Sequence, residues 1–140
     1  MIFVDGVLKE VKSTPPGTDV TALLASFTPE VRDLALAARS FVLETIPNLI
    51  EMADAKARII GYGYSPRYAD QVCMLMPTKV GVNLGIAYAM ELPDPKKLLQ
   101  GTGKLHRHVK LKNKLDLDNV ALHALLNAAL SRRERIERSP

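Results

Sequence analysis

The sequence is poor in the residues on which several classes of protein depend. A single cysteine, Cys73, rules out an internal disulfide framework and a metal site made of cysteines alone. Tryptophan is absent and aromatic residues make up only 5% of the 140 residues, so a stacking platform for single-stranded nucleic acid is poorly supplied. No apolar run approaches the roughly 20 residues that a membrane-spanning helix needs, so we expect no membrane partner.

Catalytic and targeting signatures are lacking as well. There is no paired-carboxylate, Ser-His-Asp or Rossmann pattern, so an ordinary hydrolase or dehydrogenase has no support and no cofactor is expected. Residues 1–6 lack a basic stretch followed by a long apolar run, which indicates no signal peptide and a cytoplasmic location. Apolar residues make up 47% and charged residues 24%, a mixture typical of a globular domain.

Positive charge is concentrated in the last third of the chain. Residues 101–140 carry nine Lys/Arg and four Asp/Glu, a balance of +5, whereas residues 1–100 carry ten and eleven, a balance of −1. The basic residues form two clusters: Lys104, Arg107, Lys110, Lys112 and Lys114, then Arg132, Arg133, Arg135 and Arg138. Such patches attract phosphates, nucleic acid or acidic partners, although a solvated basic face is the plainer interpretation.

The first residues predict an arm that precedes the domain. Asp5-Gly6 between short apolar runs is a type I′ hairpin signal, and residues 13–18 read as a linker because of their two prolines and glycine. We therefore expect an N-terminal β-hairpin arm and linker over residues 1–17 and a single domain over residues 18–140. The apolar arm suggests a homo-oligomer.

Helices are expected on both sides of a strand-rich middle. Residues 19–26 predict a short helix capped by Thr18 or Asp19. A longer helix is predicted over Thr28–Ile46, with Pro29 at its first position and apolar residues at helical spacing. A final helix is predicted over residues 116–131.

The middle of the chain is rich in short β-branched, aromatic and methionine runs separated by turn residues. Short connections imply antiparallel neighbours. Asp116 or Asp118 is expected to cap the final helix. Helical patterns on both sides of this strand-rich middle indicate the α+β fold class, a twisted antiparallel sheet of about five strands with helices packed on one face. The expected strands are 49–53, 58–64, 71–76, 80–88 and 106–112.

One run of residues has a distinctive order. Asp94-Pro95 precedes the glycine pair Gly101 and Gly103, then Lys104, a basic strand over residues 107–111 and a helix with leucine spacing. From residue 29 onward the chain resembles the YdhG-like family of domains of unknown function. The resemblance implies an α+β fold with a curved antiparallel sheet, similar to frataxin-type proteins. Some relatives are described as frataxin-like intracellular iron chaperones.

The same run supplies the candidate binding site. Two glycines let backbone N–H groups approach an anion, and neighbouring cations add charge. The loop is not a Walker P-loop, because Leu98 replaces the expected glycine and no Ser/Thr follows Lys104. Alternatively, both glycines serve only a tight turn. The candidate ligand-binding residues are Lys79, Gly101, Gly103, Lys104, Arg107, His108 and Lys110.

The leading interpretation is a non-enzymatic cytoplasmic binding module for an anionic ligand, carrying phosphate or carboxylate, or for an acidic protein surface. The alternative from the resemblance is an iron chaperone. Iron prefers carboxylate oxygens, and the long helix offers three acidic residues opposed by Arg32 and Arg39. A second alternative is weak nucleic-acid binding through the basic C-terminal third.

Other side chains carry weaker functional hypotheses. His106 and His108 share a strand face and, with His123, have the chemistry to bind a metal, but the adjacent cations oppose this, and no metal is expected. Cys73 lies in an apolar run and is expected to behave as a small buried hydrophobe. The four tyrosines either line a pocket or are half-buried strand residues.

Overall fold

A computed structural model describes residues 3–4, 7–8, 15–103 and 105–138 of the chain. Strands β1 (Phe3–Val4) and β2 (Val7–Leu8) pair antiparallel, while the turn residues between them lie outside the described residues. The division into an arm and a domain stays a prediction. The remaining elements are α1 (Thr18–Leu24), α2 (Pro29–Thr45), β3 (Ile50–Asp54), β4 (Ile59–Gly63), η1 (Tyr68–Asp70), β5 (Gln71–Pro77), β6 (Val82–Ala87), η2 (Ala89–Glu91), β7 (His106–Leu111), η3 (Lys114–Asp118) and α3 (Val120–Arg138).

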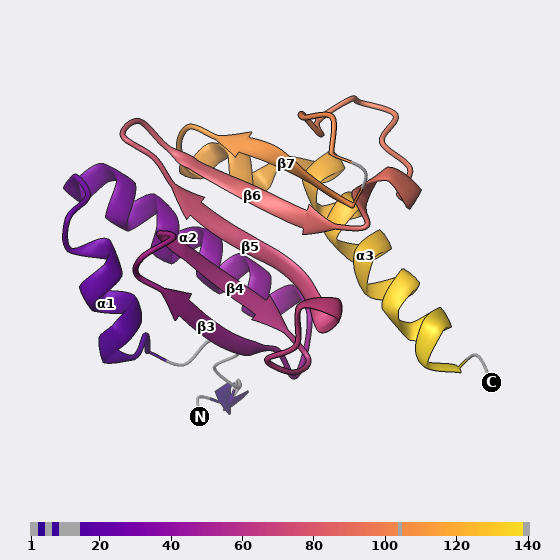
Figure 1. Cartoon of the computed structure of the whole chain (residues 1–140), viewed down its shortest axis with the longest axis horizontal. Helices are drawn as coiled ribbons and strands as arrows, with labels where there is room; N and C mark the ends of the chain where they lie inside the picture. Colours follow the sequence, from indigo (N-terminus) through magenta and orange to yellow (C-terminus); the bar gives the residue numbers. More distant parts are fainter. Residues whose placement is uncertain (1–2, 5–6, 9–14, 104, 139–140) are drawn as a thin grey trace.

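The architecture is α+β, as the order of helical and strand patterns predicted. Five strands form one sheet in the order β3-β4-β5-β6-β7, and every neighbouring pair is antiparallel. Figure 1 shows α2 and α3 behind this sheet, with the strands in front. All five predicted strands are present, and most of their ends lie within one or two residues of the predicted ones.

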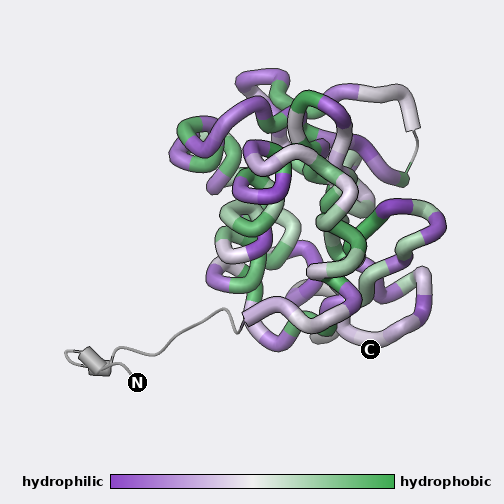
Figure 2. The backbone as a smooth tube through the Cα atoms, turned by 90° about the vertical axis from the view of Figure 1, so that its left-hand side faces the viewer, coloured by the Kyte–Doolittle hydropathy of each residue, from purple (hydrophilic) through white to green (hydrophobic). Residues whose placement is uncertain are grey.

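One face of the sheet packs against the helices. Because strand side chains alternate between faces, the register places Tyr62, Cys73 and Ile86 in one row on the same face, and all three are fully buried. α2 contacts β5 and β6 on this side, and α3 contacts β6. In the edge-on view the helices and the strands form two layers (Figure 2). The hydrophobic core lies between these layers.

The other face of the sheet carries a second row of residues that no described helix covers. The register aligns Met52, Gly61, Met74, Gly85 and His108, one from each strand. We call this side of the sheet the open face. Its residues are partly exposed except Gly85, which is buried.

The start of α2 follows the predicted capping chemistry. Thr28 Oγ1 accepts a 3.2 Å hydrogen bond from Val31 N, and Pro29 occupies the first helical turn. The start of α1 differs from the prediction. Its N-cap is Gly17, neither Thr18 nor Asp19, because the Asp19 carboxylate accepts from the adjacent Val20 N instead of capping the helix.

The final helix begins later and ends later than predicted. Asp116 is not its cap: its carboxylate accepts from Lys112 N at 2.7 Å and belongs to the capping box of η3. Asp118 ends that 3₁₀ turn, and Asn119 Oδ1 then accepts from Ala121 N at 2.8 Å. α3 continues to Arg138 because no proline or glycine interrupts residues 120–138. No helix in the described part of the chain is long and apolar enough to cross a membrane.

A buried ion pair joins α2 to the sheet. The Arg39 guanidinium donates to both Glu51 oxygens, with Nε at 2.6 Å and Nη2 at 3.1 Å. The Tyr62 hydroxyl donates to Glu51 Oε2 at 2.7 Å. Burial, followed by this hydrogen bond, raises the pKa of Tyr62, so its hydroxyl stays a donor. The Arg39 side chain is 5% exposed and Glu51 16%, so the pair is largely removed from water.

Removing one partner of this pair should destabilise the fold severely. Arg39→Ala leaves Glu51 buried without its counter-charge, and we expect a loss of about 3–5 kcal/mol in the free energy of unfolding. Urea denaturation measures this loss. Glu44→Ala, an exposed change on the same helix, is the control and should stay within about 0.5 kcal/mol of the parent. A loss below about 1 kcal/mol in Arg39→Ala would contradict the assignment.

Candidate functional site

The glycine-containing loop predicted to bind anions folds back onto β7. Gln100 and His108 exchange two backbone hydrogen bonds, of 2.7 and 3.1 Å. Gly101 follows with a φ of 102°, a conformation that favours glycine, and a Cβ added there would lie 3.7 Å from the His108 ring. The backbone conformation of the turn therefore favours glycine at this position, while the space beside the imidazole does not require it.

The basic residues of the predicted site lie on two faces of the sheet. Arg107 aligns with Ile86 in the row on the helix-covered face, and its Nε donates to Gly103 O at 3.0 Å. His108 and Lys110 lie on the open face. Lys79 is exposed in the connection between β5 and β6, and Lys104 lies outside the described residues. Among the described residues of this set, the structure brings Gly101 to His108 and Gly103 to Arg107, but it places Arg107 on the opposite face of the sheet from His108 and Lys110.

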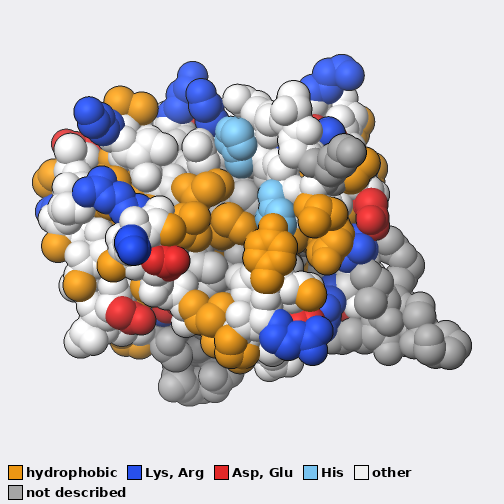
Figure 3. Space-filling view, in the orientation of Figure 1, with side chains coloured by type: hydrophobic (Ala, Val, Ile, Leu, Met, Phe, Trp, Pro, Cys, Tyr) orange, Lys and Arg blue, Asp and Glu red, His pale blue; other side chains and the backbone are white. Residues whose placement is uncertain are grey.

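The open face holds a groove that sequence reasoning missed. Its volume is about 630 Å³, within the usual range for small-molecule sites. Figure 3 shows hydrophobic side chains gathered across the middle of this face, with charged side chains around them. The groove is lined by Met52, Asp54, Ile59, Gly61, Pro66, Tyr68, Gln71, Met74 and His106. The Asp54 carboxylate therefore lies at the β3–β4 end, away from β7.

One strand glycine, Gly85, lets two methionine side chains cross the open face. A Cβ added at Gly85 would lie 2.9 Å from Met74 Cγ and 3.1 Å from Met76 Cε, so both methionine side chains extend across this glycine. Gly85 is the residue opposite both Met74 and His108 in the register. The thioethers therefore extend toward β7 and the imidazole. Methionine adapts readily to the shape of a ligand.

His106 supplies a polar group at the edge of the groove. A 3.2 Å hydrogen bond joins its Nδ1 to the Tyr68 hydroxyl, and the two ring centroids are 5.4 Å apart. The Nε2 atom is buried and has no hydrogen-bond partner among the described residues. Leaving such an atom unpaired costs about 1–3 kcal/mol.

Basic side chains lie beside the apolar part of the open face. Met74 on β5 and His108 on β7 are two strand spacings apart, with Gly85 of β6 between them. In the next row, Met76 and Lys110 are likewise two strand spacings apart, with Asn83 between them. Two spacings correspond to about 10 Å between the methionine and the β7 positions. A ligand that lies on the methionines therefore has the Lys110 ammonium group within reach at one end.

The other candidate residues have structural settings. His123 lies on α3, where its ring centroid is 4.8 Å from that of Phe41, so it does not complete a site with His106 and His108. Within the described part of the chain, no group of three or more His, Cys, Asp or Glu residues is placed to hold a metal ion. Burial raises the pKa of Cys73 to about 12, so its thiol stays protonated and packs as a hydrophobe.

The tyrosines separate into different roles. Tyr62 is fully buried and bonds Glu51, whereas Tyr68 lines the groove with 67% of its surface exposed. Tyr64 and Tyr88 each lie against an arginine of α3. One signal in the sequence pointed to the groove: Met74 and Met76 alternate with buried residues in β5, so both faces of this strand are apolar.

Comparisons with protein-family models, with curated proteins and with solved structures find no match for this chain. The resemblance to the YdhG-like family stays an expectation from the sequence.

The partly buried imidazole of His106 predicts a pH dependence of stability. Burial lowers the pKa of His106 below its usual value of 6.5, so between these two values the unfolded state binds a proton that the folded state does not. Stability is therefore fully present above about pH 6.5 and falls as the pH drops toward the folded-state pKa. We expect the Tm of the parent to fall more steeply than that of His106→Gln between about pH 7 and pH 5. Equal slopes, or an imidazole that titrates above 6.5 by NMR, would contradict this.

Proposed function

We propose that the protein is a non-enzymatic binding module for a small ligand that has an apolar body and one anionic group. The apolar body lies in the groove of the open face, against Met52 and Met74. The anionic group, a carboxylate or phosphate, lies toward His108 and Lys110 on β7. The observation that carries this proposal is that the apolar groove and the basic side chains occupy the same face of one sheet.

The expected interaction energies assign different roles to the two ends of the ligand. Each buried methylene contributes about 0.8 kcal/mol, so the apolar body supplies most of the affinity. An exposed charge pair contributes only about 0.2–1 kcal/mol, and Lys110 is exposed. Lys110 therefore selects and orients an anionic ligand, while the groove retains it. The site has several features of a small-molecule pocket, which is mostly apolar with a few placed polar groups.

The YdhG-like and frataxin-like fold assignment is part of this proposal. What supports it is the order of elements, with helices before the five-stranded antiparallel sheet and a helix after it. The observed site favours neither the iron-chaperone alternative nor nucleic-acid binding.

The test uses straight-chain carboxylates as probes, below the concentrations at which they form micelles. Hexanoate, octanoate and decanoate are titrated by calorimetry, and we expect Kd to fall by about tenfold for each two added methylenes. Met74→Gln, which keeps the side-chain length but adds an amide, should weaken octanoate binding by tenfold or more. Absence of saturable binding, or a Kd independent of chain length, would contradict the groove.

A second pair of measurements tests the anionic end. Lys110→Ala should weaken octanoate binding by up to about fivefold, the equivalent of 1 kcal/mol, and leave octanol binding unchanged because octanol carries no charge. Lys56→Ala, in the exposed turn between β3 and β4, is the matched control and should leave both affinities unchanged. Equal loss of octanol and octanoate binding in Lys110→Ala would contradict a role in charge recognition.

A further inference from the structure

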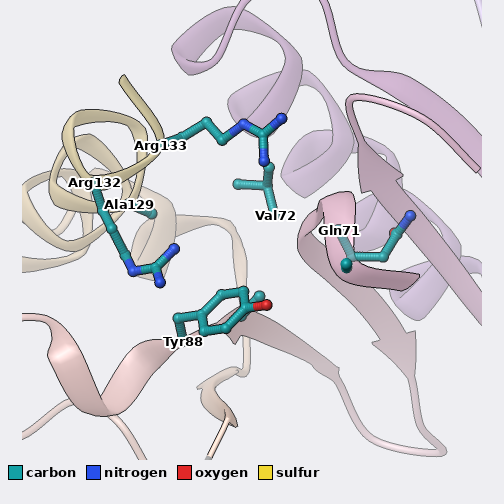
Figure 4. Close-up of a pocket in the computed structure, with 8 residues that line it drawn as sticks. Gln71, Val72, Tyr88, Ala129, Arg132 and Arg133 are labelled. Atoms are coloured by element: carbon teal, nitrogen blue, oxygen red, sulfur yellow. The ribbon is translucent and has the colours of Figure 1, made fainter. Parts of the chain in front are cut away.

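A second hollow lies between α3 and the sheet. It has a volume of about 110 Å³, and its lining includes Val72, Tyr88, Ala129, Arg132 and Arg133. Figure 4 shows the two arginine side chains extending from α3 toward Val72 and Tyr88. Gln71 contributes to this lining and to that of the groove, but the two arginines belong to the smaller pocket alone. We call this hollow the two-arginine pocket.

Both guanidinium groups are held in place before any ligand arrives. Arg132 Cζ lies 4.0 Å from the centre of the Tyr88 ring, and Arg133 Cζ lies 4.8 Å from that of Tyr64. Their side chains are only 16% and 23% exposed. An arginine stacked on an aromatic ring loses less freedom when it binds an anion, so the cost of ordering the site is small.

The backbone at Tyr88 is unusual. Its φ is 56°, in the left-handed region that non-glycine residues rarely adopt, at a cost of about 1–3 kcal/mol. Hydrogen bonds from Ala89 N to Leu105 O and from Glu91 N to Tyr88 O hold this conformation. The strained residue is the one whose ring supports Arg132, so the strain is located at the pocket.

Two carboxylates accompany the arginines. Glu91 accepts two hydrogen bonds from Arg132, with Nε to Oε1 at 2.6 Å and Nη2 to Oε2 at 3.5 Å. Asp70 accepts from Arg133, with 3.5 Å between Oδ1 and Nη1. The Glu91 side chain is 53% exposed while its partner Arg132 is 16% exposed. Glu91 is therefore the partner that can rotate into water while the guanidinium stays. An incoming anion competes with this carboxylate.

We propose that the two-arginine pocket binds the phosphate group of a small molecule and that Glu91 is the carboxylate that this phosphate displaces from Arg132. A phosphate monoester presents three acceptor oxygens and nearly two negative charges, which suits two guanidinium forks. The volume is several times the roughly 10–15 Å³ that one water needs by the same measure, so it holds a group of a few atoms. This site is independent of the proposed ligand on the open face.

The experiment is a calorimetric titration with inorganic phosphate at constant ionic strength, with sodium chloride as the balancing salt. We expect saturable binding to the parent and at least tenfold weaker binding to Arg132→Gln. Glu91→Gln removes the competing carboxylate and keeps its shape, so phosphate should bind about fivefold more tightly. These opposite changes are what a displacement site predicts.

Controls separate the pocket from general attraction and from misfolding. Lys56→Gln removes one positive charge from an exposed turn and should bind phosphate as the parent does. Arg132→Lys keeps the charge but lacks the fork, and its affinity should lie between those of the parent and Arg132→Gln. Weaker binding to Glu91→Gln, equal binding to Arg132→Gln and the parent, or no saturable heat with the parent would each overturn the proposal.

Discussion

The packing of α2 against one face of the five-stranded sheet is the interaction on which the rest of the structure depends. Arg39 on α2 reaches Glu51 on β3, and Tyr62 on β4 donates to the same carboxylate, so one buried ion pair joins the helix to two strands. Since α3 packs on the same side, the alternate side chains of every strand are directed away from the helices. The open face, with its groove, is a consequence of this one-sided packing.

Much of this fold could be predicted because its signals are local. Thr28 and Pro29 form a short-range start signal, and the structure uses both as expected. The strand runs were recognisable by composition, and their short connections implied antiparallel pairing. Predictions were wrong where two local solutions competed: Asp116 had the chemistry to cap a helix, but its carboxylate bonds the backbone of Lys112 and closes the η3 turn. The end of α3 carries no breaker, so composition alone placed it too early.

The candidate sites were harder to predict because they depend on which residues align across strands. Strand alternation in β7 separates Arg107 from His108 and Lys110, so a basic run in the sequence divides between two faces. The register that aligns Met74, Gly85 and His108 in one row is set by three separate strands and cannot be read from any one of them. The arginines after Ser131 were visible as a charged cluster, but their pocket needs a helix that continues past that residue.

Methionine methyl groups provide the most direct test of the central claim, that a ligand with an apolar body occupies the open face. The chain has five methionines, and Met52, Met74 and Met76 lie on that face while Met90 lies in η2. NMR spectra of the methyl-labelled protein are recorded as octanoate is added. The account predicts saturable shifts of the Met52, Met74 and Met76 resonances, with Met90 unchanged. Shifts confined to Met90, or no shift of the three at saturating octanoate, would contradict it.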